Sequence, residues 1–152
     1  MLKDGGIKTR IIQQYIPIMN SLINKYLSIF ELFVDFNLDE TFNEVIKSRH
    51  RDTFSYSSFS EGEKLRINLC ILFAWRTIAK MRNSVSTNLL FFDEILDGAM
   101  DTTGVETLLE TLKTLNESDN IFIISHRGQD YGEKFDNHIR FKKIKNFSRI
   151  VE

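Results

Sequence analysis

The chain has 152 residues, of which 42% are hydrophobic and 27% charged, with a formal net charge of −1. This length allows one domain with a real hydrophobic core, the composition is typical of soluble globular proteins, and the near-zero charge argues against wholesale polyanion binding. No signal peptide or bilayer-spanning apolar run occurs, and the single cysteine, Cys70, is expected to be a buried, reduced thiol. These features indicate a cytoplasmic protein.

The first long apolar pattern lies in residues 12–33. Apolar side chains recur there with alternating spacings of four and three, at Ile12, Ile16, Met19, Ile23, Tyr26, Phe30 and Phe33. Such a heptad pattern is typical either of a coiled-coil seam or of an amphipathic helix that packs in a core. Pro17 lacks a backbone N–H, so it predicts a kink or the start of the second half of the helix.

Residues 36–46 alternate apolar and polar side chains and are interrupted by Asp39 and Glu40. This pattern predicts a β-hairpin of two half-exposed strands. The short basic stretch at residues 47–51 is interpreted as solvated surface, with contact to nucleotide or DNA as the alternative.

The stretch from residue 59 to residue 75 organises the rest of the chain. Ser60 is a good helix N-cap, and Glu63 lies three residues later, where its carboxylate can reach back to the cap's backbone N–H. The residues that follow are nearly all apolar, which predicts a helix buried over most of its surface. The Ser60 hydroxyl, the open backbone at Gly62 and the positive end of the helix dipole suit a phosphate oxygen. An ordinary capped core helix would have the same residues.

Two adjacent carboxylates, Asp93 and Glu94, end a short apolar run that begins at Asn88. The run predicts a strand buried on both faces of a parallel sheet, and ligands of open α/β sheets bind beyond the carboxyl ends of the strands. There one carboxylate can hold Mg²⁺ through its water shell, and the other can orient or deprotonate an attacking water. A second predicted strand, residues 121–125, is followed by His126, which can hydrogen-bond a terminal phosphate or that water.

Helical spacing of apolar residues between Thr103 and Leu115 completes a strand–helix–strand unit, whose crossover should be right-handed. Residues 137–142 alternate like a final edge strand with basic residues facing outward. Bases dominate residues 134–149, whereas acids dominate residues 93–119. This separation predicts an anion-binding face apart from a nucleotide site, with the candidate DNA-binding residues Arg140, Lys142, Lys143 and Lys145.

The capped Ser-x-Gly helix, the Asp-Glu pair and the histidine resemble, in this order, the C-terminal half of an ABC-type ATPase head. Residues 60–63 are similar to the signature loop of that family and residues 92–94 to its Walker B strand. Residues 98–101 resemble its D-loop, and His126 resembles its switch histidine.

Glu63–Lys64 and Ile95, which stands where transporters usually have proline, resemble the SMC-like, DNA-repair branch of the family. Within that branch the chain resembles the SbcC-type ATPase subunits of tailed-phage recombination nucleases. The chain departs from the usual sequence pattern of the family in two places. Glu61 replaces the usual glycine of the signature loop, and the stretch before Asp101 is one residue longer than is common.

The resemblance implies an α/β fold with a parallel sheet core and flanking helices. Residues 35–152 would be the C-terminal lobe of an ABC ATPase head, and residues 1–34 the end of a coiled-coil helix. The implied cofactors are ATP and Mg²⁺, and the implied partners are an N-terminal Walker A lobe, a second head, a nuclease subunit and double-stranded DNA. Because the chain has no G-x-x-x-x-G-K-[ST] loop, it is expected to be half a site and inactive alone.

The resemblance also implies a role for each candidate residue. Ser60 and the N–H of Gly62, with Glu63, would bind the γ-phosphate of ATP held by a partner head, and the two sites would be coupled by Asp101. Mg²⁺ would be held by Asp93, the attacking water by Glu94 and the γ-phosphate by His126.

Two other readings of the sequence stay open. One is a non-catalytic module that docks a nuclease or DNA, which the missing Walker A loop favours and the intact carboxylates and histidine oppose. The other, weaker reading is the nucleotide-binding subunit of an ABC transporter.

Overall fold

The computed structural model describes residues 13–41, 43–48, 53–81, 87–115, 119–127 and 130–151. The basic residues 49–51 and Ile12 of the heptad pattern lie outside these ranges. The described part is α/β, as predicted. No helix in the described ranges is both long enough and apolar enough to cross a membrane.

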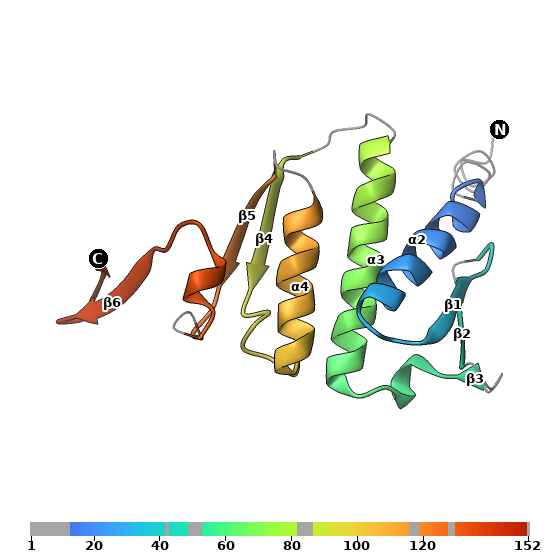
Figure 1. Ribbon diagram of the computed structural model, residues 1–152, viewed down its shortest axis with the longest axis horizontal. Coiled ribbons are helices and arrows are strands. Elements are labelled where there is room, and N and C mark those ends of the chain that lie inside the picture. Colours follow the sequence, from blue (N-terminus) through green and yellow to red (C-terminus); the bar gives the residue numbers. More distant parts are fainter. Residues whose placement is uncertain are drawn as a thin grey trace, which may run out of the picture.

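Figure 1 shows the elements side by side, from the β1–β3 sheet through α2, α3 and α4 to β4 and β5, with β6 at the far end. The helices are α2 (Ile16–Ile29), α3 (Glu61–Met81) and α4 (Thr102–Leu115), with 3₁₀ turns η1 (Tyr56–Ser58) and η2 (Gly132–Lys134). The strands are β1 (Val34–Leu38), β2 (Glu44–Ser48), β3 (Thr53–Phe54), β4 (Leu89–Asp93), β5 (Asn120–Ile124), β6 (Arg140–Ile144) and β7 (Phe147–Val151).

Helix α2 begins at Ile16 with Pro17 in its first turn, where a missing backbone N–H breaks no helical bond. The heptad residues from Ile16 to Phe30 are buried in the core. Among them Tyr26 packs on Phe73 of α3, with ring centroids 5.5 Å apart. Over this stretch the heptad pattern therefore marks the core face of a packed helix, whereas Phe33 at its end is exposed.

The predicted hairpin is confirmed, because β1 and β2 pair antiparallel with the buried residues Phe36 and Ile46 opposite each other. The short strand β3, which was not predicted, pairs with β2. Two asparagines of α2 hold the free edge of β1. Asn24 accepts a hydrogen bond from the Phe36 N–H at 2.9 Å, and Asn20 accepts one from the Leu38 N–H at 2.9 Å. The hairpin is therefore fixed to α2.

Helix α3 buries one face completely, including Cys70 and Phe73, and burial raises the pKa of the Cys70 thiol to about 12. Leu72 and Trp75 are 41% and 45% exposed. The prediction that most of this helix is buried is therefore wrong. Helices α2 and α4 flank α3 on two sides (Figure 1). Leu72 and Trp75 lie on a part of the helix surface that the described residues cover only in part.

The strand–helix–strand unit is confirmed, because β4 and β5 pair parallel from Leu89 opposite Asn120 to Asp93 opposite Ile124. Figure 1 shows α4 between this pair and α3. The prediction that the first strand is buried on both faces is wrong. Phe91 and Phe122 stack with ring centroids 4.9 Å apart, and both are exposed. The described helices cover only the opposite face of the two strands.

The predicted final edge strand at residues 137–142 is confirmed in part as β6, whereas the strand that follows it, β7, was not predicted. Strand β6 begins at Arg140 and pairs antiparallel with β7 in a sheet separate from β4 and β5. The turn residues Lys145 and Asn146 both have positive φ, at 45° and 67°, which hairpin turns of type I′ require. Every residue of β6 is exposed, so its basic side chains are accessible as predicted.

Candidate functional site

The N-terminus of α3 has the predicted capping box. The N–H and hydroxyl of Ser60 donate to Oε2 of Glu63 at 2.9 and 2.8 Å, and the Glu63 N–H donates back to the Ser60 hydroxyl at 3.3 Å. The two bonds from Ser60 lower the pKa of Glu63, which is therefore ionised near neutral pH. To donate to a phosphate, the Ser60 hydroxyl would first have to leave Glu63.

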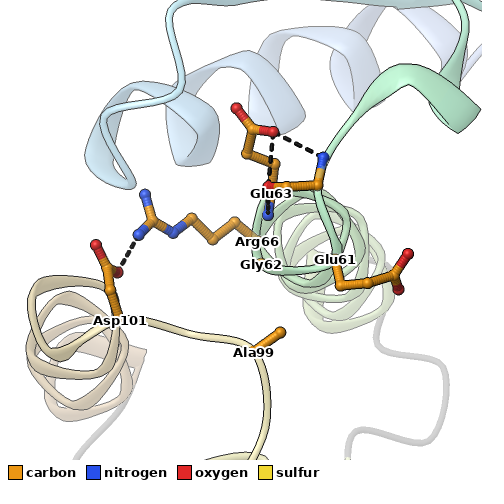
Figure 2. A pocket seen from close by; sticks show the side chains of 7 residues that line it. Glu61, Gly62, Glu63, Arg66, Ala99 and Asp101 are labelled. Carbon is orange, nitrogen blue, oxygen red and sulfur yellow. Dashed lines mark hydrogen bonds and ion pairs between the residues drawn. The ribbon is translucent and has the colours of Figure 1, made fainter.

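Next to this cap lies a pocket of about 480 Å³ (Figure 2), lined by Ser60, Glu61, Gly62, Glu63, Arg66, Ala99 and Asp101. The lining joins the first turn of α3 to the loop before α4. A Cβ atom on Gly62 would lie 2.7 Å from the backbone oxygen of Ala99, so the close approach of the two segments requires glycine. Glu61 extends into solvent and pairs with Lys64 at 2.7 Å. Glu61, which stands where the signature loop of the resembled family usually has glycine, therefore does not fill the pocket.

Arg66 of α3 reaches across this pocket to Asp101, with which it forms an ion pair (Figure 2). The Asp101 carboxylate also accepts the Gly104 N–H at 3.0 Å and so caps α4. The bond from Gly104, followed by the contact with Arg66, lowers the pKa of Asp101. A Cβ atom on Gly104 would lie 2.9 Å from the Arg66 guanidinium. Sequence reasoning identified Asp101 but missed Arg66, which stands alone in an apolar run.

The candidate hydrolytic residues lie where β4 and β5 end. Asp93 closes β4, and Glu94 follows with a φ of 53°, in the left-handed region, while its N–H donates to the Ile124 oxygen at 2.8 Å. The Glu94 Oε1 and His126 Nε2 atoms are 3.4 Å apart, and both side chains are exposed. The structure thus brings together the two residues that sequence reasoning placed at neighbouring strand ends. Figure 1 shows these ends on the same side of the molecule as the N-termini of α3 and α4.

Asp97, which sequence reasoning missed, joins the two loops that carry Glu94 and His126. Its carboxylate accepts hydrogen bonds from the Ser125 hydroxyl at 2.6 Å, the His126 N–H at 2.8 Å and the Arg127 N–H at 3.2 Å. The bonds from Ser125 and His126 hold the pKa of the Asp97 carboxyl below its usual value. Its position in an acid-rich segment gave no reason to choose it over its neighbours.

The candidate DNA-binding residues are on the β6–β7 hairpin, in a different sheet from Asp93 and Glu94. Because side chains alternate between faces along a strand, Arg140 and Lys142 share one face and Lys143 lies on the other. Lys142 is directly opposite Arg149 of β7. Like charges directly opposite each other destabilise a strand pair, and an anion bound between them would relieve the repulsion.

The chain is similar in sequence to exonuclease subunits of phages. It is 46% identical over 151 residues to exonuclease subunit 2 of Enterobacteria phage T4, a match that covers 99% of this chain and 27% of the relative. The same subunit of Escherichia phage RB69 is 46% identical over 148 residues, covering 97% of this chain and 26% of the relative. The chain thus spans about a quarter of the length of these curated relatives. No protein-family model matches it.

Solved structures of SMC ATPase heads share the fold. One, from a study of ATP-driven dimerization and DNA-stimulated activation of SMC ATPases, has a TM-score of 0.73 and 17% identity, covering 94% of this chain and 88% of that chain. Another, an Smc head bound to the C-winged helix domain of ScpA, has a TM-score of 0.75 and 18% identity, covering 98% of this chain and 46% of that chain. At these identities the likeness concerns the fold alone.

Proposed function

We propose that this chain, which is related to the phage exonuclease subunits and has the fold of the C-terminal half of an SMC-type ATPase head, forms half of an ATP-hydrolysing head. The head would work with a nuclease subunit in processing DNA double-strand breaks. The observation that carries the proposal is the Glu94–His126 pair. Glu94 directly follows Asp93 at the end of β4, His126 follows β5, and their side chains come within 3.4 Å at the carboxyl ends of the two parallel strands.

In hydrolysis Glu94 would orient and deprotonate the attacking water, and His126 would hydrogen-bond the terminal phosphate. Asp93 would hold Mg²⁺, whose positive charge offsets the charge of the phosphates. Mg²⁺ usually keeps several waters and binds one or two carboxylates together with substrate phosphates. Asp93, at the end of β4, would be one such carboxylate.

The pocket beside α3 would receive the γ-phosphate of ATP held by a second copy of the head. Its binding groups would be the Ser60 hydroxyl and the Gly62 N–H at the positive end of the helix dipole. When phosphate binds, the Ser60 hydroxyl would exchange its bond to Glu63 for one to a phosphate oxygen. Asp101, held by Arg66 of the same helix, would couple the two sites of the dimer.

The Walker A loop would come from an N-terminal lobe on the same or a separate chain. The exposed apolar face of β4 and β5, with Phe91 and Phe122 stacked on it, is a surface that such a lobe would bury. Residues 1–34 would then be the end of a coiled-coil arm that enters the lobe formed by residues 35–152. Double-stranded DNA would bind the hairpin face that carries Arg140 and Lys142, with Lys145 in its turn.

The test is ATP hydrolysis by this chain alone and by a mixture with a separately expressed Walker A lobe of the same family. We expect turnover only in the mixture, and its loss in Glu94→Gln. Glu106→Gln is the matched control, because it makes the same carboxylate-to-amide change at an exposed position on α4, and it should keep full turnover. If the lobes associate but the wild-type mixture is inactive, the chain is a docking module for a nuclease or DNA. Wild-type turnover in Glu94→Gln would remove Glu94 from the mechanism.

A further inference from the structure

Asp97 belongs to the same tight turn as Glu94. The backbone N–H of Asp97 donates to the Glu94 oxygen at 3.0 Å, so the two residues are the ends of one turn after β4. The Asp97 carboxylate leaves this turn and accepts hydrogen bonds from three consecutive residues after β5, which are Ser125, His126 and Arg127. The turn that carries Glu94 is therefore fastened directly to the backbone of His126.

A second contact fixes the same two loops. The Arg127 guanidinium donates through Nη1 to the Leu96 oxygen at 3.2 Å. The Ser125 hydroxyl, which donates to Asp97, also accepts the Arg127 N–H at 2.9 Å. The His126 side chain itself extends into solvent, with Glu94 at 3.4 Å. Its position is therefore set by the backbone bonds of its loop.

We infer that Asp97 is a positioning residue that holds His126 against Glu94 for ATP hydrolysis. This inference rests on the proposed function of that pair. Asp97 would touch neither the nucleotide nor the attacking water. It would act by fixing the His126 backbone, so that the imidazole and the Glu94 carboxylate converge on one point between the two strand ends.

An amide cannot replace the Asp97 carboxylate. Its single oxygen can serve the donors on one side of the group, but its NH₂ donates and would face another N–H or O–H donor. Asp97→Asn therefore keeps the size of the side chain and breaks part of the three-bond cluster. Displacement of a catalytic group by about 1 Å can lower a rate by about a hundredfold.

The experiment measures kcat and KM for ATP in the complete head, meaning this chain combined with a Walker A lobe. We expect Asp97→Asn to lower kcat by about tenfold to a hundredfold and to change KM by less than about threefold, because ATP itself is bound by the other lobe. Asp136→Asn is the matched control. Asp136 is an exposed aspartate between η2 and β6, and the kcat of this variant should equal that of wild type.

A double-mutant cycle separates positioning from a general loss of structure. If Asp97 acts through His126, adding Asp97→Asn to His126→Ala changes kcat by less than about twofold. If the kcat of the double mutant falls by the product of the two single-mutant losses, the inference is overturned. If Asp97→Asn does not fold, Ser125→Ala, which removes one bond of the cluster, must show the same non-additivity with a smaller loss of about threefold. No turnover by the wild-type head would overturn the proposed function as well, whereas wild-type turnover with additive losses overturns this inference alone.

Discussion

Arg66 and Asp101 form an ion pair that joins the N-terminal ends of α3 and α4 across 35 residues of sequence. Asp101 has a second role, because it caps α4 through the Gly104 N–H. We expect Asp101→Ala to be less stable than Asp101→Asn by about 1 kcal/mol, because asparagine keeps the cap and alanine does not. The exposed ion pair itself should contribute less than about 1 kcal/mol. Urea unfolding of the two variants measures the difference, and equal stabilities would contradict the capping role.

The close contact between Gly62 and Ala99 allows a test of whether the shape of the pocket matters for ATP turnover. Gly62→Ala places a methyl group 2.7 Å from the backbone oxygen of Ala99, so α3 and the loop that precedes α4 must separate and the pocket must change shape. We expect the complete head carrying Gly62→Ala to lose most of its ATP turnover. Gly98→Ala is the matched control in the same loop, because its added methyl would have no atom within 4 Å. Equal turnover by both variants would mean that this contact does not matter for the site.

Asp119 stabilises the C-terminal end of α3, where it pairs with Arg76 and Lys80. Its nearly buried carboxylate lies 3.0 Å from the guanidinium of Arg76 and 2.6 Å from the ammonium of Lys80. Burial raises the pKa of Asp119, but the bonds and charges of Lys80 and Arg76 outweigh it and the net shift is downward. Asp119→Asn should cost about 2–4 kcal/mol at neutral pH, because two cations lose their partner.

The sign of the shift sets the pH dependence of this contribution. A lowered folded-state pKa gives stability that is complete above the unfolded-state pKa of about 4 and is lost as the pH falls through the folded-state value. The stability difference between wild type and Asp119→Asn should therefore stay constant above about pH 5 and shrink as the pH falls below about 4, the unfolded-state pKa of aspartate. Asp130→Asn, which breaks an exposed pair, should stay within about 0.5 kcal/mol of wild type. A difference that stays constant through this fall in pH would contradict the assignment.

Local chemistry made part of this structure predictable. The Ser60–Glu63 cap spans three residues, and the β4–α4–β5 unit is encoded by apolar periods within each segment. The contacts that assemble the site span longer distances: Arg66 lies 35 residues from Asp101, and Asp97 lies 28 residues from Ser125. No local pattern pairs such residues.

Two errors in the predicted strands have different causes. An apolar run such as Leu89–Asp93 shows which side chains avoid water but not which neighbour covers them, so the exposed face of Phe91 could not be foreseen. The β6–β7 hairpin was missed because its turn, Lys145–Asn146, lacks the glycine that usually reveals a type I′ turn.

The basic hairpin predicts a DNA contact on one face only. Reversing the charges of Lys142 and Arg149, which lie opposite each other, should weaken binding of double-stranded DNA by the complete head. Each lost phosphate contact should reduce the slope of log affinity against log salt by about 0.9. Lys143→Glu, on the other face of the same strand, is the control and should bind as wild type does. An unchanged salt slope in the Lys142/Arg149 variant would exclude this face from DNA binding.

The exposed apolar face of β4 and β5 predicts where the Walker A lobe docks. Phe91 and Phe122 are 61% and 47% exposed, and burying such a side chain contributes about 1.5–3 kcal/mol. We therefore expect Phe91→Ser to weaken association of the two lobes by about tenfold or more, measured by titration calorimetry. The same change should reduce binding of an apolar dye by the chain alone, because it removes part of the exposed patch.

Leu72→Ser is the matched control, since Leu72 is an apolar residue of α3 with 41% exposure. It should leave the association constant unchanged, because the proposed docking face is on the strands. Wild-type affinity in Phe91→Ser, with the lobes still associating, would place the lobe contact elsewhere. A different partner would then cover the stacked phenylalanines. The nuclease subunit, which the docking-module alternative names, would be the next partner to titrate.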